Sequence, residues 1–301
     1  MPSAALFVWN RAWLVLLVTM ALWGGNGVAS RLAVGRITPM SLVFMRWLAV
    51  CLLLGLLLRR ALREHAPTLR AHRRYIALMA GFGFTGFTVL FYAAAYWTSA
   101  VNITLLQAAI PPLVLLGAAL TGRGRINAMQ IAGLAVTLGA VALIATHGEP
   151  WRIAETRFNT GDILILVACV FYAGYTLGLR DRPPLPPLVF FAALAFAALV
   201  TSVPFTVAEV ATGRFFWPSP GGIAILVFVT LGPSLASQLL YMRGVELIGP
   251  SRAGLFSNLT PVFGALFAVL LLREEFHLHH AIALVLALGG IWLSEWGAVT
   301  R

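Results

Sequence analysis

Ten apolar stretches, separated by short polar segments, divide the chain almost from end to end. They cover residues 13–34, 40–58, 75–97, 101–120, 128–146, 161–179, 187–208, 222–242, 253–272 and 281–298. Each approaches the ~20 residues that a helix needs to cross a hydrocarbon layer of ~30 Å. Helices of soluble proteins keep a polar face toward water, and these stretches lack one. The pattern predicts an all-α integral membrane protein with ten transmembrane helices.

The composition agrees with a protein that is mostly embedded in lipid. Of the 301 residues, 60% are hydrophobic and 10% are charged, with a mean hydropathy of +0.90; soluble domains carry about 25% charged residues. The net charge of +11 comes from arginines at the ends of the stretches, which favours contact with membrane lipids over nucleic acid. Cys51 and Cys169 lie inside apolar stretches and are interpreted as buried apolar residues. We expect no cofactor, and a monomer suffices for this architecture.

The arginines are distributed unevenly between the two faces that alternating spans define. One face receives 14 of the 21: Arg11, Arg59, Arg60, Arg63, Arg70, Arg73, Arg74, Arg123, Arg125, Arg180, Arg182, Arg243, Arg252 and Arg301. The other receives Arg31, Arg36, Arg152, Arg157, Arg214 and Arg273. Short loops rich in arginine stay in the cytoplasm. The bias therefore predicts a bacterial inner membrane protein with both termini in the cytoplasm.

The second half of the chain repeats features of the first at a shift of 150 residues. Pro111 falls on Pro261, Arg123 on Arg273 and Gly139 on Gly289. The repeat predicts two units, residues 1–147 and 158–301, with five spans each. Because five is odd, the second unit enters the membrane from the opposite face. Two such inverted repeats are typical of secondary transporters, in which alternating access exchanges the conformations of the halves.

Several short motifs strengthen this interpretation, and they occur in a characteristic order along the whole chain. They are Trp23-Gly24-Gly25-Asn26 in the first stretch, Arg46 in the second, Pro111, Pro261, and Arg273-Glu274 before the last stretch. In this order and within this repeat, the chain resembles the EamA-type, ten-helix branch of the drug/metabolite transporter superfamily. The resemblance implies transport of a small metabolite, and the aromatic content is similar to that of the bacterial aromatic amino acid exporters of that group.

The acidic residues all fall in loops or near the ends of the predicted helices, so none lies near the middle of the membrane. A carrier of cationic drugs coupled to protons would need a carboxylate there. A neutral or zwitterionic solute is therefore expected. The exception among buried charges is Arg46, about two turns into the second stretch. It either snorkels toward the interface, contacts an anion, or fastens the two halves together.

Neutral polar and aromatic side chains form patches on single helix faces, since residues three or four apart are neighbours. They predict a central cavity bounded by spans 1, 3, 4, 6, 8 and 9, although hydrogen bonds between helices are the alternative use. The candidate solute-binding residues are Trp23, Asn26, Thr88, Tyr92, Gln107, Tyr172, Tyr175, Ser237, Gln238, Tyr241, Ser257 and Asn258.

Prolines and glycines mark candidate gating positions. Proline removes an N–H and releases the carbonyl four residues earlier, so Pro111 and Pro261 are predicted to free the carbonyls of Gln107 and Ser257. A solute's amino group would be a partner for such carbonyls. The candidate bending points are Gly24, Gly25 and Gly27 in span 1 and Gly232 and Pro233 in span 8.

Two further patterns are discounted. Residues 81–86, Gly-Phe-Gly-Phe-Thr-Gly, match a dinucleotide fingerprint but lie inside a span without a preceding strand; close packing or a bend is the better use. His277, His279 and His280 are interpreted as a solvated loop rather than a metal site.

The sequence thus predicts a non-enzymatic secondary transporter that exports neutral or zwitterionic metabolites, with amino acids, aromatic ones included, as the leading class. A carrier of nucleosides or sugar derivatives, a channel and an intramembrane enzyme are the alternatives. The enzyme would need clustered catalytic groups at membrane depth, which the sequence lacks.

Overall fold

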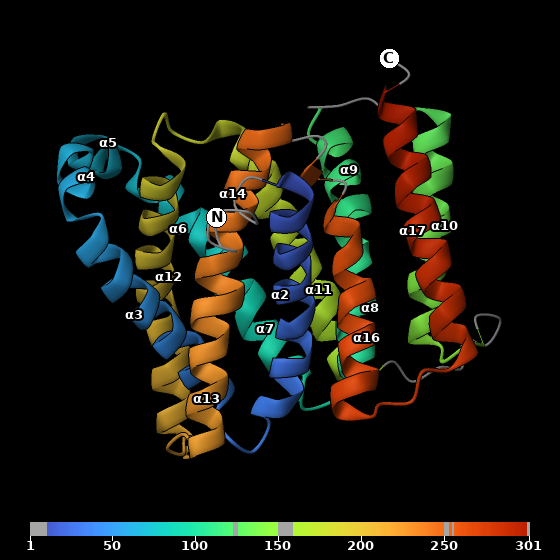
Figure 1. Cartoon of the computed structure of the whole chain (residues 1–301), viewed down its shortest axis with the longest axis horizontal. Helices are drawn as coiled ribbons and strands as arrows, with labels where there is room; N and C mark the ends of the chain where they lie inside the picture. Colours follow the sequence, from blue (N-terminus) through green and yellow to red (C-terminus); the bar gives the residue numbers. More distant parts are fainter. Residues whose placement is uncertain (1–10, 123–125, 150–158, 250–252, 255, 300–301) are drawn as a thin grey trace, which may run out of the picture.

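The computed structural model describes residues 11–122, 126–149, 159–249, 253–254 and 256–299. Within these ranges every regular element is a helix, and the long helices stand side by side (Figure 1). Eight of them are long and apolar enough to cross a membrane, and the last two spans appear as shorter apolar helices. The prediction of an all-α membrane protein with ten spans is confirmed.

The first five spans occupy the N-terminal half. They are α2 (Ala12–Ala33), α3 (Pro39–Leu57), the composite α6–η1–α7 (Arg73–Ala80, Gly81–Gly86, Phe87–Ala94), the composite α8–η2–α9 (Ala100–Leu106, Gln107–Ala109, Ile110–Leu120) and α10 (Ala128–Ala145). Two short helices, α4 (Arg59–Glu64) and α5 (Ala66–Ala71), join the second and third spans. The basic residues of that connection lie on these exposed helices.

The second five spans follow in the C-terminal half. They are α11 (Thr160–Gly178) with η4 (Leu179–Asp181), α12 (Pro187–Ala211), the composite α13–η5–α14 (Pro220–Val229, Thr230–Ala236, Ser237–Ile248), η6–α16 (Ser257–Leu259, Thr260–Leu272) and α17 (Leu278–Val299). The eighth span is longer than the 222–242 expected from hydropathy. Its polar residues beyond Tyr241 are helical as well.

The packing of the helices repeats when the two halves are exchanged. Helix α2 packs against α14 and α16, and its counterpart α11 packs against α7 and α9. Helix α3 packs on its counterpart α12, α10 on α17, and α8 on α16. Because each half holds five spans, counterparts cross the molecule in opposite directions. The chain therefore folds as two inverted five-helix repeats, as predicted.

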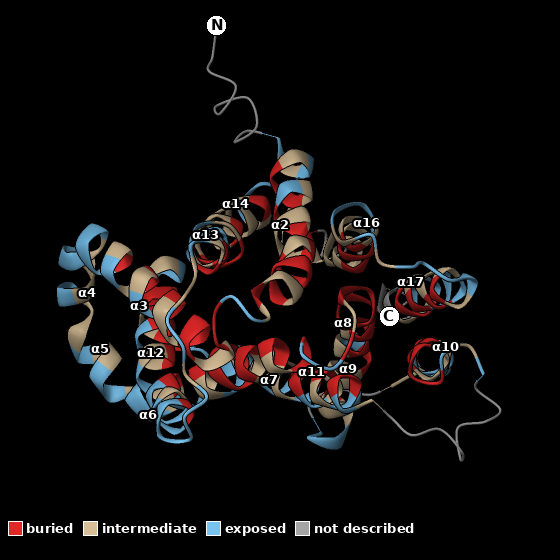
Figure 2. Ribbon diagram, turned by 90° about the horizontal axis from the view of Figure 1, so that it is seen from below, coloured by how far each residue is buried: buried red, intermediate tan, exposed pale blue. Residues whose placement is uncertain are grey.

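The spans form two central groups flanked by two pairs (Figure 2). One group contains α2, α13–α14 and α16, and the other contains α7, α8, α9 and α11. The pair α3 and α12 closes one side of the space between the groups, and the pair α10 and α17 lies at the other side. Many large apolar side chains on the outer surface are exposed, including Leu56, Phe196, Leu271 and Val285, as a lipid-facing surface requires.

Breaks in helical geometry also repeat between the halves. Both the third and the eighth span contain a π-helical turn, η1 and η5. The 3-10 turns η2 and η6, at residues 107–109 and 257–259, are related by the same shift of 150 that relates Pro111 to Pro261. The repeat therefore extends to the irregular turns, which are common at functional sites in helices.

Gly24 and Gly27 of span 1 serve close packing in this structure, and their role as bending points stays a prediction. Helix α2 runs without a break from Ala12 to Ala33. A Cβ atom on Gly24 would lie 2.6 Å from the backbone nitrogen of Gly264, and one on Gly27 would lie 2.5 Å from Cγ2 of Thr104. Small residues let these helices approach one another, as is usual in membranes. By contrast, Gly232 and Pro233 do lie in a break, the π turn η5.

The replacement Gly24→Ala is expected to destabilise the protein by about 1–3 kcal/mol, because the new methyl group meets backbone that has no room to move. The matched control is Gly55→Ala, since a Cβ at Gly55 meets no atom within 4 Å. Thermal unfolding of the purified variants in detergent measures the difference. Equal midpoints for both variants would contradict the close contact between α2 and α16.

Candidate functional site

A cavity of about 230 Å³ lies between the two central groups of spans. It is lined from the first half by residues of α2, α3, η1, α7, η2 and α9, and from the second half by residues of α11, η5, α14, η6 and α16. Ile291 of α17 completes the lining. Pockets between helices of bundles are common places for small ligands. This cavity is the candidate site for the solute.

Most of the residues predicted to bind the solute surround this one cavity. Those that line it are Trp23, Asn26, Thr88, Gln107, Tyr172, Tyr175, Gln238, Ser257 and Asn258, together with Arg46, Pro111 and Pro261. Tyr92, Ser237 and Tyr241 lie outside the lining, as do Gly24 and Gly232. The grouping is a geometric finding, and binding by these residues stays a prediction.

The residues outside the lining support those that form it. The Tyr92 hydroxyl donates to Oδ1 of Asn26 at 2.8 Å and accepts from Nη1 of Arg46 at 2.9 Å. The Tyr241 ring lies against the Trp23 ring with centroids 5.4 Å apart, while the Ser237 hydroxyl donates to the Pro233 carbonyl. Tyr92 and Tyr241 therefore hold lining side chains in place, and Ser237 holds the π turn.

Aromatic rings form one wall of the cavity. Tyr172 and Tyr175 of α11 have ring centroids 5.5 Å apart, and Tyr172 also lies 5.1 Å from Phe87 of α7. Tyr175 meets Phe84 edge to face at 5.5 Å. Gly83 lies opposite the Tyr175 ring, where a Cβ atom would overlap it. Hence the 81–86 segment provides a π turn and close packing, as interpreted from the sequence.

The carbonyls expected to be released by the prolines of spans 4 and 9 are paired, and that prediction is wrong. The backbone N–H of Ile110 donates to the carbonyl of Gln107, and that of Thr260 donates to the carbonyl of Ser257. A 3-10 turn directly before each proline replaces the lost bond with one from the residue three positions on. Gln107 and Ser257 line the cavity, and Nε2 of Gln107 donates to the Ile103 carbonyl at 3.0 Å.

Pro233 in the eighth span also leaves its carbonyl partner bonded, but through a side chain. In a regular helix the carbonyl of Val229 would accept from the N–H of residue 233, which proline lacks. That carbonyl accepts instead from the Ser234 hydroxyl at 2.6 Å. Ser234 in turn accepts a hydrogen bond from Nε of Arg46. The π turn η5 thus connects to the guanidinium of α3, a link that sequence patterns did not reveal.

Three carboxylates join the two halves at the end of the bundle where α2 ends and α3 begins, which we name the carboxylate end (bottom of Figure 1). They are Asp162, Glu209 and Glu274, and their side chains accept hydrogen bonds from residues of the first half. The opposite end, which carries α4 and α5 with their arginines, is named the basic end. From the sequence alone, acidic residues near helix ends are expected to face solvent. The sequence therefore did not reveal these contacts.

Glu274 closes the carboxylate end between the two central groups. It follows α16, and its two oxygens accept from the backbone N–H groups of Ala100 and Val101, each at 2.9 Å. These N–H groups open α8 and carry the positive end of its dipole. Arg31 of α2 adds a nitrogen 3.9 Å from Glu274 and donates to the Ala95 carbonyl. One carboxylate therefore joins elements on both sides of the cavity.

Glu209 and Asp162 make related contacts. Glu209, near the end of α12, accepts from the backbone N–H groups of Met40 and Ser41 at 3.1 Å and caps α3. Asp162, in the first turn of α11, accepts from the Thr98 hydroxyl at 2.5 Å and from the Asn102 amide at 3.5 Å. Both are buried, and hydrogen bonding to charged groups offsets the cost of burying them.

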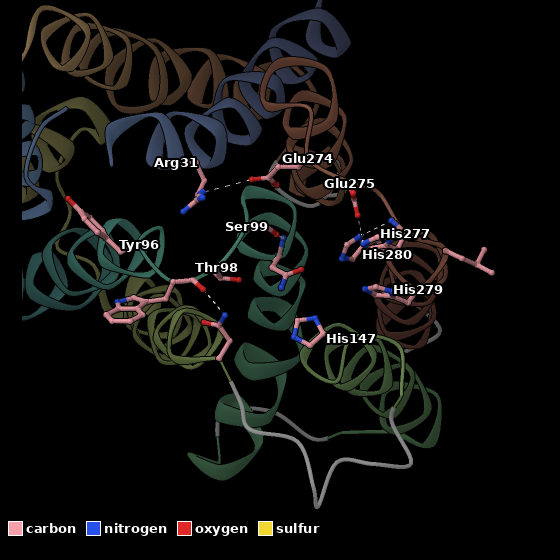
Figure 3. Close-up of a pocket in the computed structure, with 14 residues that line it drawn as sticks. Arg31, Tyr96, Thr98, Ser99, His147, Glu274, Glu275, His277, His279 and His280 are labelled. Atoms are coloured by element: carbon pink, nitrogen blue, oxygen red, sulfur yellow. Dashed lines mark hydrogen bonds and ion pairs between the residues drawn. The ribbon is translucent and has the colours of Figure 1, made fainter. Parts of the chain in front are cut away.

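A second, open hollow of about 940 Å³ lies outside this closure at the carboxylate end (Figure 3). Arg31, Glu274 and the three histidines of the last connection border it. His279 and His280 belong to the first turn of α17 and His280 is buried, so the interpretation as a wholly solvated loop was wrong. Among the described residues, no group of His, Cys, Asp and Glu has the arrangement of a metal site.

Comparison with known proteins agrees with this architecture. The model of the EamA-like transporter family matches the chain twice, over residues 10–146 and 159–296. A solved crystal structure shares the fold with a TM-score of 0.62 and 20% sequence identity, covering 94% of this chain and 95% of that one.

Relatives of this chain in two bacteria are named as transporters. The "Uncharacterized transporter YyaM" of Bacillus subtilis is 26% identical over 261 residues, which cover 83% of this chain and 82% of the relative. The "Uncharacterized inner membrane transporter YicL" of Salmonella typhimurium is 26% identical over 294 residues, covering 94% and 95%. Two matched halves, the membrane spans and the transporter relatives lead to one conclusion. The chain belongs to the EamA-like transporter family of the drug/metabolite transporter superfamily and is a multi-pass membrane transporter.

Proposed function

We propose that the protein exports small zwitterionic or neutral metabolites by alternating access, with amino acids, aromatic ones included, as its main solutes. The observation that carries this proposal is the cavity between the two groups of spans. Its lining combines aromatic rings with amide and hydroxyl groups, and among the described lining residues none is acidic. Such a lining suits a solute with an apolar body and a polar end.

The asymmetry between the two ends supports alternating access. At the carboxylate end α8 packs against α16, and Glu274 holds that contact. Further along the same two spans, Pro111 of α9 and Ser257 of η6 both line the cavity. The fourth and ninth spans thus approach one another on the carboxylate side and border the cavity on the other. Exchange of the conformations of the two repeats would open the carboxylate end and close the basic end.

The closure at the carboxylate end has no equivalent in the sequence at the basic end. The shift of 150 residues places Glu274 on Gly124 and Glu209 on Arg59. Neither residue can accept hydrogen bonds through a carboxylate from the start of a helix. These contacts support the interpretation that the carboxylate end is closed in this form, and the two positions that the shift relates to Glu274 and Glu209 carry no carboxylate.

The orientation follows from the arginines. The sequence assigns 14 of the 21 to the basic end, which supports an orientation in a bacterial inner membrane with that end and both termini in the cytoplasm. Arg123, Arg125, Arg252 and Arg301 of that set lie outside the described residues. With this orientation, the cavity would load from the cytoplasm and release outward, in the direction of export.

Counterflow in proteoliposomes tests the proposal. Vesicles preloaded with unlabelled L-tryptophan or L-phenylalanine should accumulate the labelled amino acid, with saturation, and nucleosides or sugars should not compete. Replacement of Tyr175, Gln238 or Asn258 by alanine removes contacts in the cavity, and we expect roughly 10-fold lower flux for each, as for a loss of about 1.4 kcal/mol. Leu120→Ala and Trp217→Ala, at exposed positions, are the controls.

Each alternative has its own result in this assay. If nucleosides or sugars inhibit the flux and amino acids do not, the transported solutes are nucleosides or sugar derivatives instead of amino acids. Flux that does not saturate and shows no counterflow would indicate a channel. Unchanged kinetics in all three alanine variants would contradict the assignment of the cavity.

A further inference from the structure

Arg46 is a buried cation in the membrane-spanning part of the protein. It lies two turns into α3, and only 6% of its surface is exposed. Among the described residues, no carboxylate lies within ion-pair distance of its guanidinium. Glu274, Glu209 and Asp162 lie at the carboxylate end and contact other groups. Charged residues inside membrane spans are costly and usually pair with a partner or serve a function.

Neutral groups hold the guanidinium in place without neutralising it. Nη1 donates to the Tyr92 hydroxyl, and Nε donates to the Ser234 hydroxyl. Tyr92 is fixed by Asn26, and Ser234 by the carbonyl of Val229. The position of Arg46 is therefore determined by α2, α7 and the π turn η5, and none of these contacts is an acidic side chain.

Part of the hydrogen-bonding capacity of Arg46 is unused. A guanidinium has five N–H donors in a fixed plane, and two of them have the acceptors just described. The other three have no acceptor among the described residues, and the side chain lines the central cavity. Planar, paired N–H groups of this kind match the two oxygens of a carboxylate.

The rest of the cavity would accommodate the other parts of such a solute. Tyr172, Tyr175 and Trp23 present aromatic rings, which pack against an apolar body and attract a cationic amino group. The side chains of Gln107 and Asn258 add carbonyl oxygens that accept from an amino group. Arg46 lines the cavity as its cation, and no described lining residue is acidic to compete for it.

We propose that Arg46 is the receptor for a carboxylate on the transported solute, so that the solute class is narrowed to carboxylates with an apolar or aromatic body, amino acids among them. This inference rests on the proposed function only in taking the central cavity as the place where the solute binds. It excludes amines, amides, nucleosides and uncharged sugars as preferred solutes. A link between α3 and η5 alone would explain the neutral contacts of Arg46, but it predicts no preference for a carboxylate.

Ligand-induced thermal stabilisation of the purified full-length protein tests the inference without requiring transport. The probes are three scaffolds, with indole, phenyl and isobutyl side chains. Each is supplied as the L-amino acid, its amide and the deaminated acid, at one ionic strength. We expect the amino acid and the deaminated acid to bind roughly 10-fold or more tightly than the amide in at least one scaffold, because a hydrogen-bonded charge pair is lost in the amide.

Two variants separate recognition from structural support. Arg46→Gln should reduce the ratio of acid to amide affinity to about one, and Arg46→Lys should retain part of it, since lysine keeps the charge but loses the planar fork. Arg60→Gln, on the exposed helix α4, is the matched control. If Arg46→Gln does not fold, the ratio of acid to amide affinity in the unmodified protein still tests the inference. The inference is overturned if no scaffold favours the acid over the amide, or if Arg46→Gln keeps the preference.

Failure of the proposed function gives a different pattern. Preferential binding of acids without counterflow of any of them would leave Arg46 as a carboxylate receptor and refute transport of these solutes. Counterflow of amino acids that amides inhibit as strongly as acids do would support transport and refute the role of Arg46.

Discussion

Oxidation of a variant that carries Gly27→Cys and Thr104→Cys is expected to stop transport completely, and reduction to restore it. Gly27 lies on α2 and Thr104 on α8, on opposite sides of the space that contains the cavity. A Cβ atom on Gly27 would lie 4.0 Å from Cβ of Thr104, within the about 3.5–4.5 Å that disulfides span. The bond would fasten the first span to the fourth on the carboxylate side of the cavity, so that this end cannot open.

Counterflow measured on one protein preparation before and after reduction gives the cleanest comparison. The native Cys51 and Cys169 are replaced by alanine in all samples, and each single cysteine variant is treated in parallel as a control for oxidation. Full activity in the oxidised, cross-linked protein would show that spans 1 and 4 need not separate during transport. The proposed closure of the carboxylate end would then be wrong.

The second large effect is expected from Glu274→Gln. The carboxylate accepts from two backbone N–H groups of α8, and hydrogen bonds to a charged group contribute about 1.5–3 kcal/mol each. Glutamine retains one acceptor and presents an N–H₂ group toward a backbone N–H. We expect the equilibrium to shift toward the form open at the carboxylate end by roughly 10- to 100-fold, since 1.4 kcal/mol corresponds to a factor of ten.

The shift of this equilibrium can be measured through the reactivity of a side chain that is buried behind Glu274 when the carboxylate end is closed. Ile103 on α8 is fully buried, so Ile103→Cys should react slowly with a thiol reagent that cannot cross the membrane. Adding Glu274→Gln should accelerate that reaction from the carboxylate end. Glu64→Gln, which removes an exposed pair with Arg60 on α4, should leave the rate unchanged. An equal rate in the Glu274→Gln protein would show that this carboxylate does not hold the end closed.

The spans and their inverted repeat could be predicted because the bilayer restricts the choices of the chain. Every buried backbone group must be paired inside the membrane, so apolar stretches of sufficient length become helices. The matches of Pro111 to Pro261 and of Gly139 to Gly289 then define the repeat. Polar residues on single helix faces also converge in the structure, because the interior between helices is the remaining place for them.

The carboxylate contacts were beyond such reasoning. Glu209 accepts from Ser41, 168 positions away in sequence, and Glu274 from Ala100, 174 positions away. Near a helix end, an acidic residue has the same local pattern whether it meets solvent or the start of another helix. Only the packing of the two halves distinguishes these cases.

Glycines and prolines were hard to interpret for another reason, which is that each residue type has two local uses. Glycine in a membrane helix permits either a bend or a close approach, and in α2 it permits the approach of α16 and α8. Proline can leave a carbonyl free, or the chain can tighten into a 3-10 turn, as it does before Pro111 and Pro261. Neighbouring helices decide between these uses, and their positions are tertiary information.

Labelling of one cysteine in the cavity from each side of the membrane tests the central claim most directly. Ala108 lines the cavity at the 3-10 turn of the fourth span, and Ala108→Cys in a protein without other cysteines adds little volume. We expect a thiol reagent that cannot cross the membrane to reach it readily from the basic end, and to reach it faster from the carboxylate end once Glu274→Gln is added. Reaction from neither side, or unhindered reaction from both sides in the parent protein, would contradict a solute pathway that opens to one face at a time.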